Sequence, residues 1–324
     1  MTYKAALATL AGIATVTAAV AWGGGAKVTT VNGTPWRNSV SDALKEAKRT
    51  GKPVLLLSMF GKLDEEMPCA NARTLRATLF KDPEFRQFVE KEAIPAWEMV
   101  RPVPHITIDF GNGEKVVRTA RGNAVMYLVN PNGKVFDAFP GVYTKEDFLP
   151  AARESIAALA KSDDATVRNF HQSRARWIPF SAVTASKRVL EGPTLRLIGA
   201  RPIRGVVVPQ PSPALEADTA KANFLRVAAG LTDSSLTPAT PQEAVAAVGA
   251  TGSTPEALAK SILQEDSKLN MERTRSVVHF YFASEKTLPT PAEARDAVLG
   301  TILKIPYKDP TMGLSDVLLP GTPR

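Results

Sequence analysis

A single cysteine, Cys69, is the residue of this 324-residue chain whose type and position best suit chemistry. The apolar run from Val54 to Leu57 has the length of a buried strand, and Pro68 is expected to begin a helix, because proline fits the first helical position. Cys69 would then lie in the first helical turn. The free amides and dipole of that turn favour a negative charge, so this pattern predicts an easily formed thiolate.

Charged residues near Cys69 act on this thiol in opposite directions. Arg73, one helical turn further along, adds positive potential and is the candidate stabiliser of a thiolate. Asp64, Glu65 and Glu66 precede the helix, and their like charge would raise the pKa of the thiol. Two interpretations therefore stay open: Cys69 is a nucleophile, or it is a small buried apolar residue.

The sequence around Cys69 resembles the thioredoxin-like superfamily. Cys69-Ala70-Asn71-Ala72 is similar to its CxxC motif, with Ala72 in place of the second cysteine. Trp36 and the amphipathic segment from Ser41 to Arg49, which is followed by Gly51-Lys52-Pro53, resemble the exported members, as does Thr78 to Pro83 (TLFKDP). The resemblance covers roughly residues 30 to 160, and it identifies Asn123, Ala124 and Val125 with the loop that faces the cysteine and forms the substrate groove.

The resemblance implies an α/β fold: a three-layer α/β/α domain with an inserted β-hairpin at 106–119. Ala124 stands where the family has a cis-proline. A cis bond before another residue costs about 3 kcal/mol, so we expect a trans bond and an altered groove. A lone thiol can form a mixed disulfide but needs an outside thiol to resolve it. We therefore expect at most monothiol exchange, with little or no autonomous dithiol reductase activity.

The elements that must position Cys69 and the groove are read from periodicity and capping residues. The predicted strands are 93–100, 124–129 and 134–139. The predicted helices begin at Pro83, capped by Asp82, and after Thr144, which forms a capping-box-like pair with Asp147. Two further helices are predicted, one from Thr254 to about Leu269 and one that begins at a capping box of Thr290 and Glu293. The predicted domain organisation is a signal peptide (1–21), a flexible lead-in (22–35), the thioredoxin-like domain (36–161), a basic Pro/Ala-rich connecting region (162–253) and a small C-terminal α+β unit (254–324). The C-terminal unit is predicted to have the order helix–strand–helix, and its strand is Ser276 to Phe282.

The N-terminus indicates export. Lys4 is followed by an uncharged apolar run, Ala5 to Ala21, which ends in the small-x-small pattern of a cleavage site. We expect a periplasmic or extracellular protein; the alternative is an uncleaved N-terminal membrane anchor. No other transmembrane segment is predicted. With one cysteine the chain can form no internal disulfide, although thiols usually pair in an oxidising compartment.

Most of the formal net charge of +8 comes from one stretch, Arg168 to Arg204, which holds eight lysines or arginines and one acidic residue. Such a stretch is typical of a surface that contacts an anionic partner, or of an ordinary solvated basic surface. Export argues against nucleic acid as that partner.

Soft metal ligands are the remaining chemical signal. Met67, Cys69 and His105, with Met59 and Met99 nearby, are weak candidates for Cu(I), but methionines are usually core residues, and no cofactor is expected. Two functions remain. One is single-cysteine thiol chemistry on a protein thiol or disulfide partner. The other is a redox-inactive thioredoxin-like scaffold that binds a protein or an anionic surface.

Overall fold

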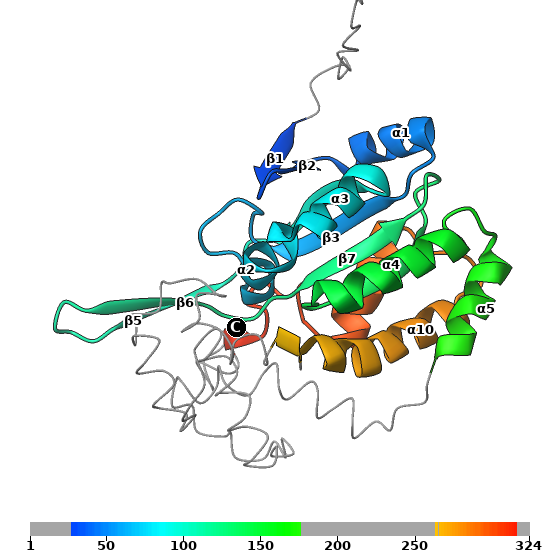
Figure 1. Ribbon diagram of the computed structural model, residues 1–324. Helices are drawn as coiled ribbons and strands as arrows, with labels where there is room; N and C mark the ends of the chain where they lie inside the picture. The colour runs from blue at the N-terminus through cyan, green and yellow to red at the C-terminus, as the bar shows by residue number, and fades with distance from the viewer. Residues whose placement is uncertain (1–26, 176–262, 265, 316–324) are drawn as a thin grey trace, which may run out of the picture.

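The computed structural model describes residues 27–175, 263–264 and 266–315 (Figure 1). The predicted signal peptide and most of the basic connecting region lie outside the described residues. So does the first part of the helix predicted to end near Leu269, but residues 263–264 and 266–269 are helical.

A mixed sheet of six strands forms the centre of the described part, in the order β1-β2-β4-β3-β7-β8. Strands β2, β4 and β3 run parallel to one another, whereas β7 is antiparallel to β3 and β8 is antiparallel to β7. The fold is therefore mixed α/β, as predicted. The strands are β1 (Val28–Val31), β2 (Thr34–Arg37), β3 (Val54–Phe60), β4 (Ile94–Arg101), β7 (Ala124–Val129) and β8 (Val135–Pro140).

Helices cover both faces of this sheet. Strands β3 and β7 are buried at every position, which is why their sequences are almost continuously apolar. Figure 1 shows α3 and α4 together over one face, where Phe85 and Phe88 of α3 pack against Phe148 of α4. The helices of this part are α1 (Val40–Thr50), α2 (Ala70–Ala77), the short 3₁₀-helix η1 (Leu79–Lys81), α3 (Pro83–Lys91), α4 (Lys145–Leu159) and α5 (Asp164–Arg174).

The predicted hairpin is confirmed. Strands β5 (His105–Asp109) and β6 (Lys115–Thr119) pair with each other as a separate two-stranded sheet. Figure 1 shows this hairpin projecting from the central sheet. It begins after β4, and the loop 120–123 connects it to β7.

The flexible lead-in predicted for residues 22–35 is wrong where the structure describes it. Strands β1 and β2 form an antiparallel hairpin, and Arg37 of β2 pairs with Ala96 of β4. The side chain of Trp36 is fully buried and packs on Phe80. Burial of this large ring stabilises the two short strands against the rest of the domain.

The strand predicted at Ser276 to Phe282 is also wrong: these residues lie in helix α10 (Arg275–Ser284). The C-terminal unit is therefore not α+β in its described part. Helix α10 follows a π-helical turn, η2 (Asn270–Thr274), and is followed by α11 (Pro291–Arg295) and a π-helix, η3 (Asp296–Ile302). The capping box predicted from Thr290 and Glu293 is confirmed and begins α11.

The C-terminal helices complete the main core. Phe282, Val298 and Leu299 belong to the same hydrophobic cluster as the sheet. Arg295 of α11 forms an ion pair with Glu98 of β4 (Nη1 to Oε1, 2.9 Å), so this segment covers the face to which Glu98 points. Helix α5 joins the core as well, although its residues were assigned to the connecting region. Nothing helical in the described ranges is long and apolar enough to cross a membrane.

Candidate functional site around Cys69

Cys69 lies between the central strand β3 and helix α2. Its backbone amide donates to the carbonyl of Phe60, the last residue of β3 (3.0 Å), and its own carbonyl accepts from Arg73 (3.2 Å). Cys69 is the N-cap residue, so the predicted placement at the amino end of this helix is confirmed, one position before the first helical turn.

The thiol does not reach solvent. The side chain of Cys69 has no exposed surface, and its Sγ donates to the carbonyl of Asn123 at 3.3 Å. Burial raises the pKa of the thiol above its usual value. That effect exceeds the lowering by backbone hydrogen bonds, first of all from Ala72, and by the charge of Arg73. The helix terminus is present as predicted, but the site favours the neutral thiol.

A close-packed loop encloses the sulfur. Gly122 has φ of +100°, and a Cβ on it would lie 3.0 Å from Cys69 Cβ and 3.1 Å from Phe60 Cβ. Asn123 fixes the next turn, because its Oδ1 accepts from the amide of Ala124 (2.7 Å) and from Asn71 Nδ2 (2.6 Å). Only a residue without a side chain allows the loop to approach the sulfur this closely.

The groove predicted at Asn123, Ala124 and Val125 is next to Cys69, as expected, but all three side chains are buried. The peptide bond before Ala124 is trans. The guanidinium of Arg73 does not bind the sulfur of Cys69. Its Nη2 donates to Thr119 Oγ1 of β6 at 3.3 Å. It contributes positive potential to the sulfur but tethers the hairpin to α2.

Of the candidate copper ligands, Met67 and His105 contact each other through a backbone oxygen and not through the methionine sulfur. The Nε2 of His105, an exposed residue of β5, lies 3.3 Å from the carbonyl oxygen of Met67. Met59 is fully buried in β3, whereas Met99 is 41% exposed. Within the described residues, the group of acidic, histidine or cysteine ligand atoms that lies close together is a different one: Asp137, His171 and His279.

This second cluster is centred on a buried ion pair. Arg275 of α10 binds both carboxylate oxygens of Asp137 on β8, at 3.1 and 2.9 Å, and is itself 3% exposed. Ser155 Oγ of α4 donates to Asp137 Oδ2 (2.5 Å), and the amide of Ala138 donates to Oδ1 (2.8 Å). Burial would raise the pKa of the Asp137 carboxyl, but Arg275 and the hydrogen bonds hold it well below its usual range.

Two histidines extend the cluster. His171 Nε2 of α5 donates to the carbonyl of Phe136 at 2.8 Å, so its Nδ1 is the acceptor for the Nδ1–H of His279, at 2.7 Å. Burial lowers the pKa of His171, and it lowers that of His279 to about 3. Both rings are therefore neutral at physiological pH, and together they join α5 to α10.

This cluster does not fit a metal ion. Nitrogen ligands of zinc lie about 2.0–2.1 Å from the metal, so two on one tetrahedral ion would be about 3.3 Å apart, farther than the two Nδ1 atoms. Both oxygens of Asp137 already accept from Arg275, and that guanidinium would repel a cation. The geometry is that of a structural hydrogen-bond network.

Sequence reasoning missed this network because its members are far apart in the chain and because Arg275 and His279 fall in or beside the predicted strand. On a helix, residues four apart share a face. The i, i+4 spacing of Arg275 and His279 is therefore the one local signal, and it is visible only once the segment is read as a helix. Comparison of the chain with protein-family models, with curated proteins and with solved structures gave no significant match.

Proposed function

We propose that this chain is a thioredoxin-like protein that works by binding a partner and does not carry out thiol–disulfide exchange. The sheet order supports the fold assignment: β2, β4, β3, β7 and β8 are arranged with two parallel and then two antiparallel pairings, and the candidate cysteine follows the central strand β3. This is the arrangement that the resemblance of residues 30 to 160 implies.

The burial of the Cys69 sulfur is the observation that carries the proposal. A thiol attacks a disulfide as its thiolate, through a linear approach that needs access to the sulfur. Cys69 has no exposed surface, and its raised pKa leaves little thiolate at neutral pH. Ala72 supplies no second thiol, so nothing in the motif could resolve a mixed disulfide.

Single-thiol exchange is the second candidate function. Its support is the N-cap position of Cys69, where backbone hydrogen bonds and Arg73 lower the thiol pKa, though by less than burial raises it. This function requires a movement of the Gly122 loop that brings the sulfur to the surface.

The compartment and the partner are parts of the same proposal. The apolar run at Ala5 to Ala21 supports export to the periplasm or beyond. The basic stretch from Arg168 to Arg204 supports an anionic surface or protein as partner. Of its members in α5, Arg174 pairs with Glu154, and Arg168 donates to the carbonyl of Lys286.

Reduction of insulin disulfides in the presence of dithiothreitol tests the proposal. We expect the full chain to give the background rate, and the Cys69→Ser variant to give the same rate. A wild-type rate clearly above that of Cys69→Ser would overturn the proposal in favour of single-thiol exchange.

A further inference from the structure

Helix α10 carries a second, partly exposed face beside the one that is buried in the core. Its inward face holds Val278 and Phe282, which are fully buried. Val277, Phe280, Tyr281 and Ser284 follow the spacing i, i+3, i+4, i+7 and form another face of the same helix. Phe280 is 63% exposed. Each apolar face of a helix is expected to pack against another surface, either of the protein or of a bound molecule.

The π-helix η3 forms a wall opposite this stripe. In a π-helix, hydrogen bonds join residues five apart, so Asp296 and Thr301 lie about one turn apart, as do Ala297 and Ile302. All four line the same pocket as the stripe. π-Helical segments are rare and are frequently found at functional sites.

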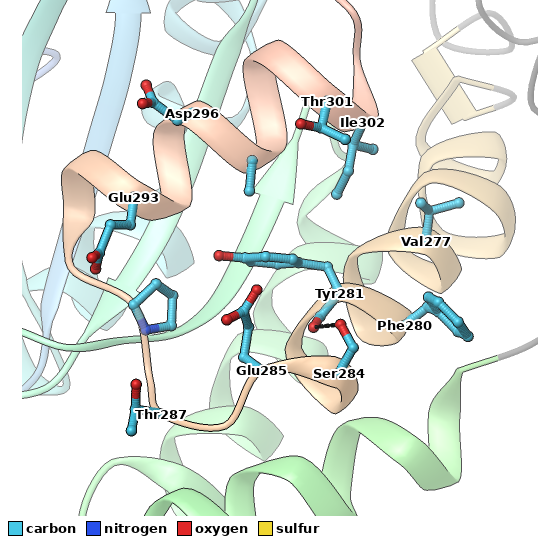
Figure 2. A pocket seen from close by; sticks show the side chains of 12 residues that line it. Val277, Phe280, Tyr281, Ser284, Glu285, Thr287, Glu293, Asp296, Thr301 and Ile302 are labelled. Atoms are coloured by element: carbon cyan, nitrogen blue, oxygen red, sulfur yellow. Dashed lines mark hydrogen bonds between the residues drawn. The ribbon is translucent and has the colours of Figure 1, made fainter.

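The two walls enclose a surface pocket of about 680 Å³, within the size range of small-molecule sites. Figure 2 shows the ring of Tyr281 reaching from α10 toward the α11–η3 wall, with Glu285 beside the ring and Glu293 on the far wall. The pocket therefore combines apolar and aromatic surface with a small set of carboxylates.

The charged residues that line the pocket are all acidic. Glu285, Glu293 and Asp296 line it, and no lysine or arginine is among its lining residues. Asp296 is paired with Lys308 (2.6 Å), and Glu293 accepts from Thr290 in the capping box. Glu285 has no hydrogen bond or ion pair within the described part of the chain. Burial raises the pKa of the Tyr281 hydroxyl, and the charges of Glu285 and Glu293 add to this effect, so both carboxylates act on the pocket interior.

We propose that this pocket binds a small organic cation, an ammonium group on an aromatic or branched apolar body. The apolar body would pack on Phe280 and Ile302, the ammonium would lie near Glu285, and the ring of Tyr281 would favour the positive charge through its π face. The site is formed by α10, α11 and η3, so the inference does not depend on whether Cys69 reacts.

Isothermal titration of the full chain with phenethylamine, and with phenylpropanoate as the matched anion, tests this inference. We expect the amine to bind at least about tenfold more tightly than the carboxylate, a difference of about 1.4 kcal/mol. The affinity for the amine should fall as salt is added, because the carboxylates are near solvent. Equal affinities, tighter binding of phenylpropanoate, or no binding of either compound would overturn the inference.

Two variants locate the site. Glu285→Gln keeps the shape of the side chain and removes its charge, and we expect it to weaken phenethylamine binding about tenfold. Glu272→Gln removes an exposed carboxylate from η2, outside the pocket, and should bind the amine as the wild type does. Unchanged affinity in Glu285→Gln would contradict the placement, and circular dichroism of both variants confirms that they fold.

Discussion

At Cys69, two general effects on a thiol compete, and their sizes decide the chemistry. A helix N-terminus stabilises a nearby negative charge by about 0.3–1 kcal/mol in exposed settings. Full burial can shift a pKa by about 3–5 units, at about 1.4 kcal/mol for each unit. Because Cys69 has no exposed surface, burial prevails and the neutral thiol is favoured. The position of the residue was predictable from Pro68 and the preceding strand, but its burial was not, because the enclosing loop is about fifty residues away.

Gly122 offers a test of this enclosure at the level of one residue. Gly122→Ala should lower the free energy of unfolding by about 1–3 kcal/mol, because the position combines a left-handed φ of +100° with a Cβ contact at 3.0 Å. Urea denaturation measures the change.

Gly111→Ala is the matched control for that substitution. Gly111 also has a left-handed φ, +74°, but nothing lies within 4 Å of its Cβ position. Gly111→Ala should therefore lower the free energy of unfolding through backbone strain alone, and clearly less than Gly122→Ala does. Equal losses in the two variants would mean that the loop does not pack against the sulfur.

Among the elements, those defined by local capping chemistry were predictable and those defined by distant contacts were not. Asp82 with Pro83, Thr144 with Asp147, and the Thr290 capping box begin helices where the sequence predicts them. Ser276 to Phe282 is apolar at five of its seven positions and was predicted to be a strand. It is a helix because its two apolar faces pack on the core and line the pocket, and local propensity is commonly overridden by such tertiary packing.

The histidine pair between α5 and α10 predicts a pH dependence of stability. The pKa of His279 is lowered from 6.5 to about 3 in the folded protein, and that of His171 is lowered as well. Between these values the unfolded chain binds more protons than the folded one. In that window His279 should lower the free energy of unfolding by about 1.4 kcal/mol for each pH unit of acidification, with its full contribution to stability present above pH 6.5. His171 should add to the loss in the same direction.

Urea denaturation of the wild type and of His279→Gln across this pH range measures the effect. The pKa of the facing Asp137 carboxyl lies well below this range, and the charges of Arg275 and Arg174 lower the pKa of both histidines further. We expect the free energy of unfolding to depend less steeply on pH in His279→Gln than in the wild type. Identical slopes in the wild type and in His279→Gln would show that the buried pair does not titrate in this range.

For the whole molecule, the C-terminal segment is part of the fold that holds the candidate site. Arg101 at the end of β4 donates to the carbonyls of Tyr307, Asp309 and Pro310, and Arg121, beside the loop that encloses Cys69, donates to that of Met312. These contacts span about two hundred residues of sequence. No pattern within either segment indicates them, which is why the C-terminal residues were predicted to be a small separate unit.

The rate at which iodoacetamide alkylates Cys69 in the folded full-length protein measures how far the thiol is enclosed. The rate is measured by mass spectrometry from pH 6 to 10 and compared with that of the urea-unfolded chain, whose thiol titrates near its ordinary pKa of about 8.5. We predict that the folded protein reacts at least about a hundredfold more slowly at pH 7, because the sulfur is enclosed and its thiolate is disfavoured. A folded-state rate equal to or above that of the unfolded chain, with a thiol pKa below 8.5, would contradict the account.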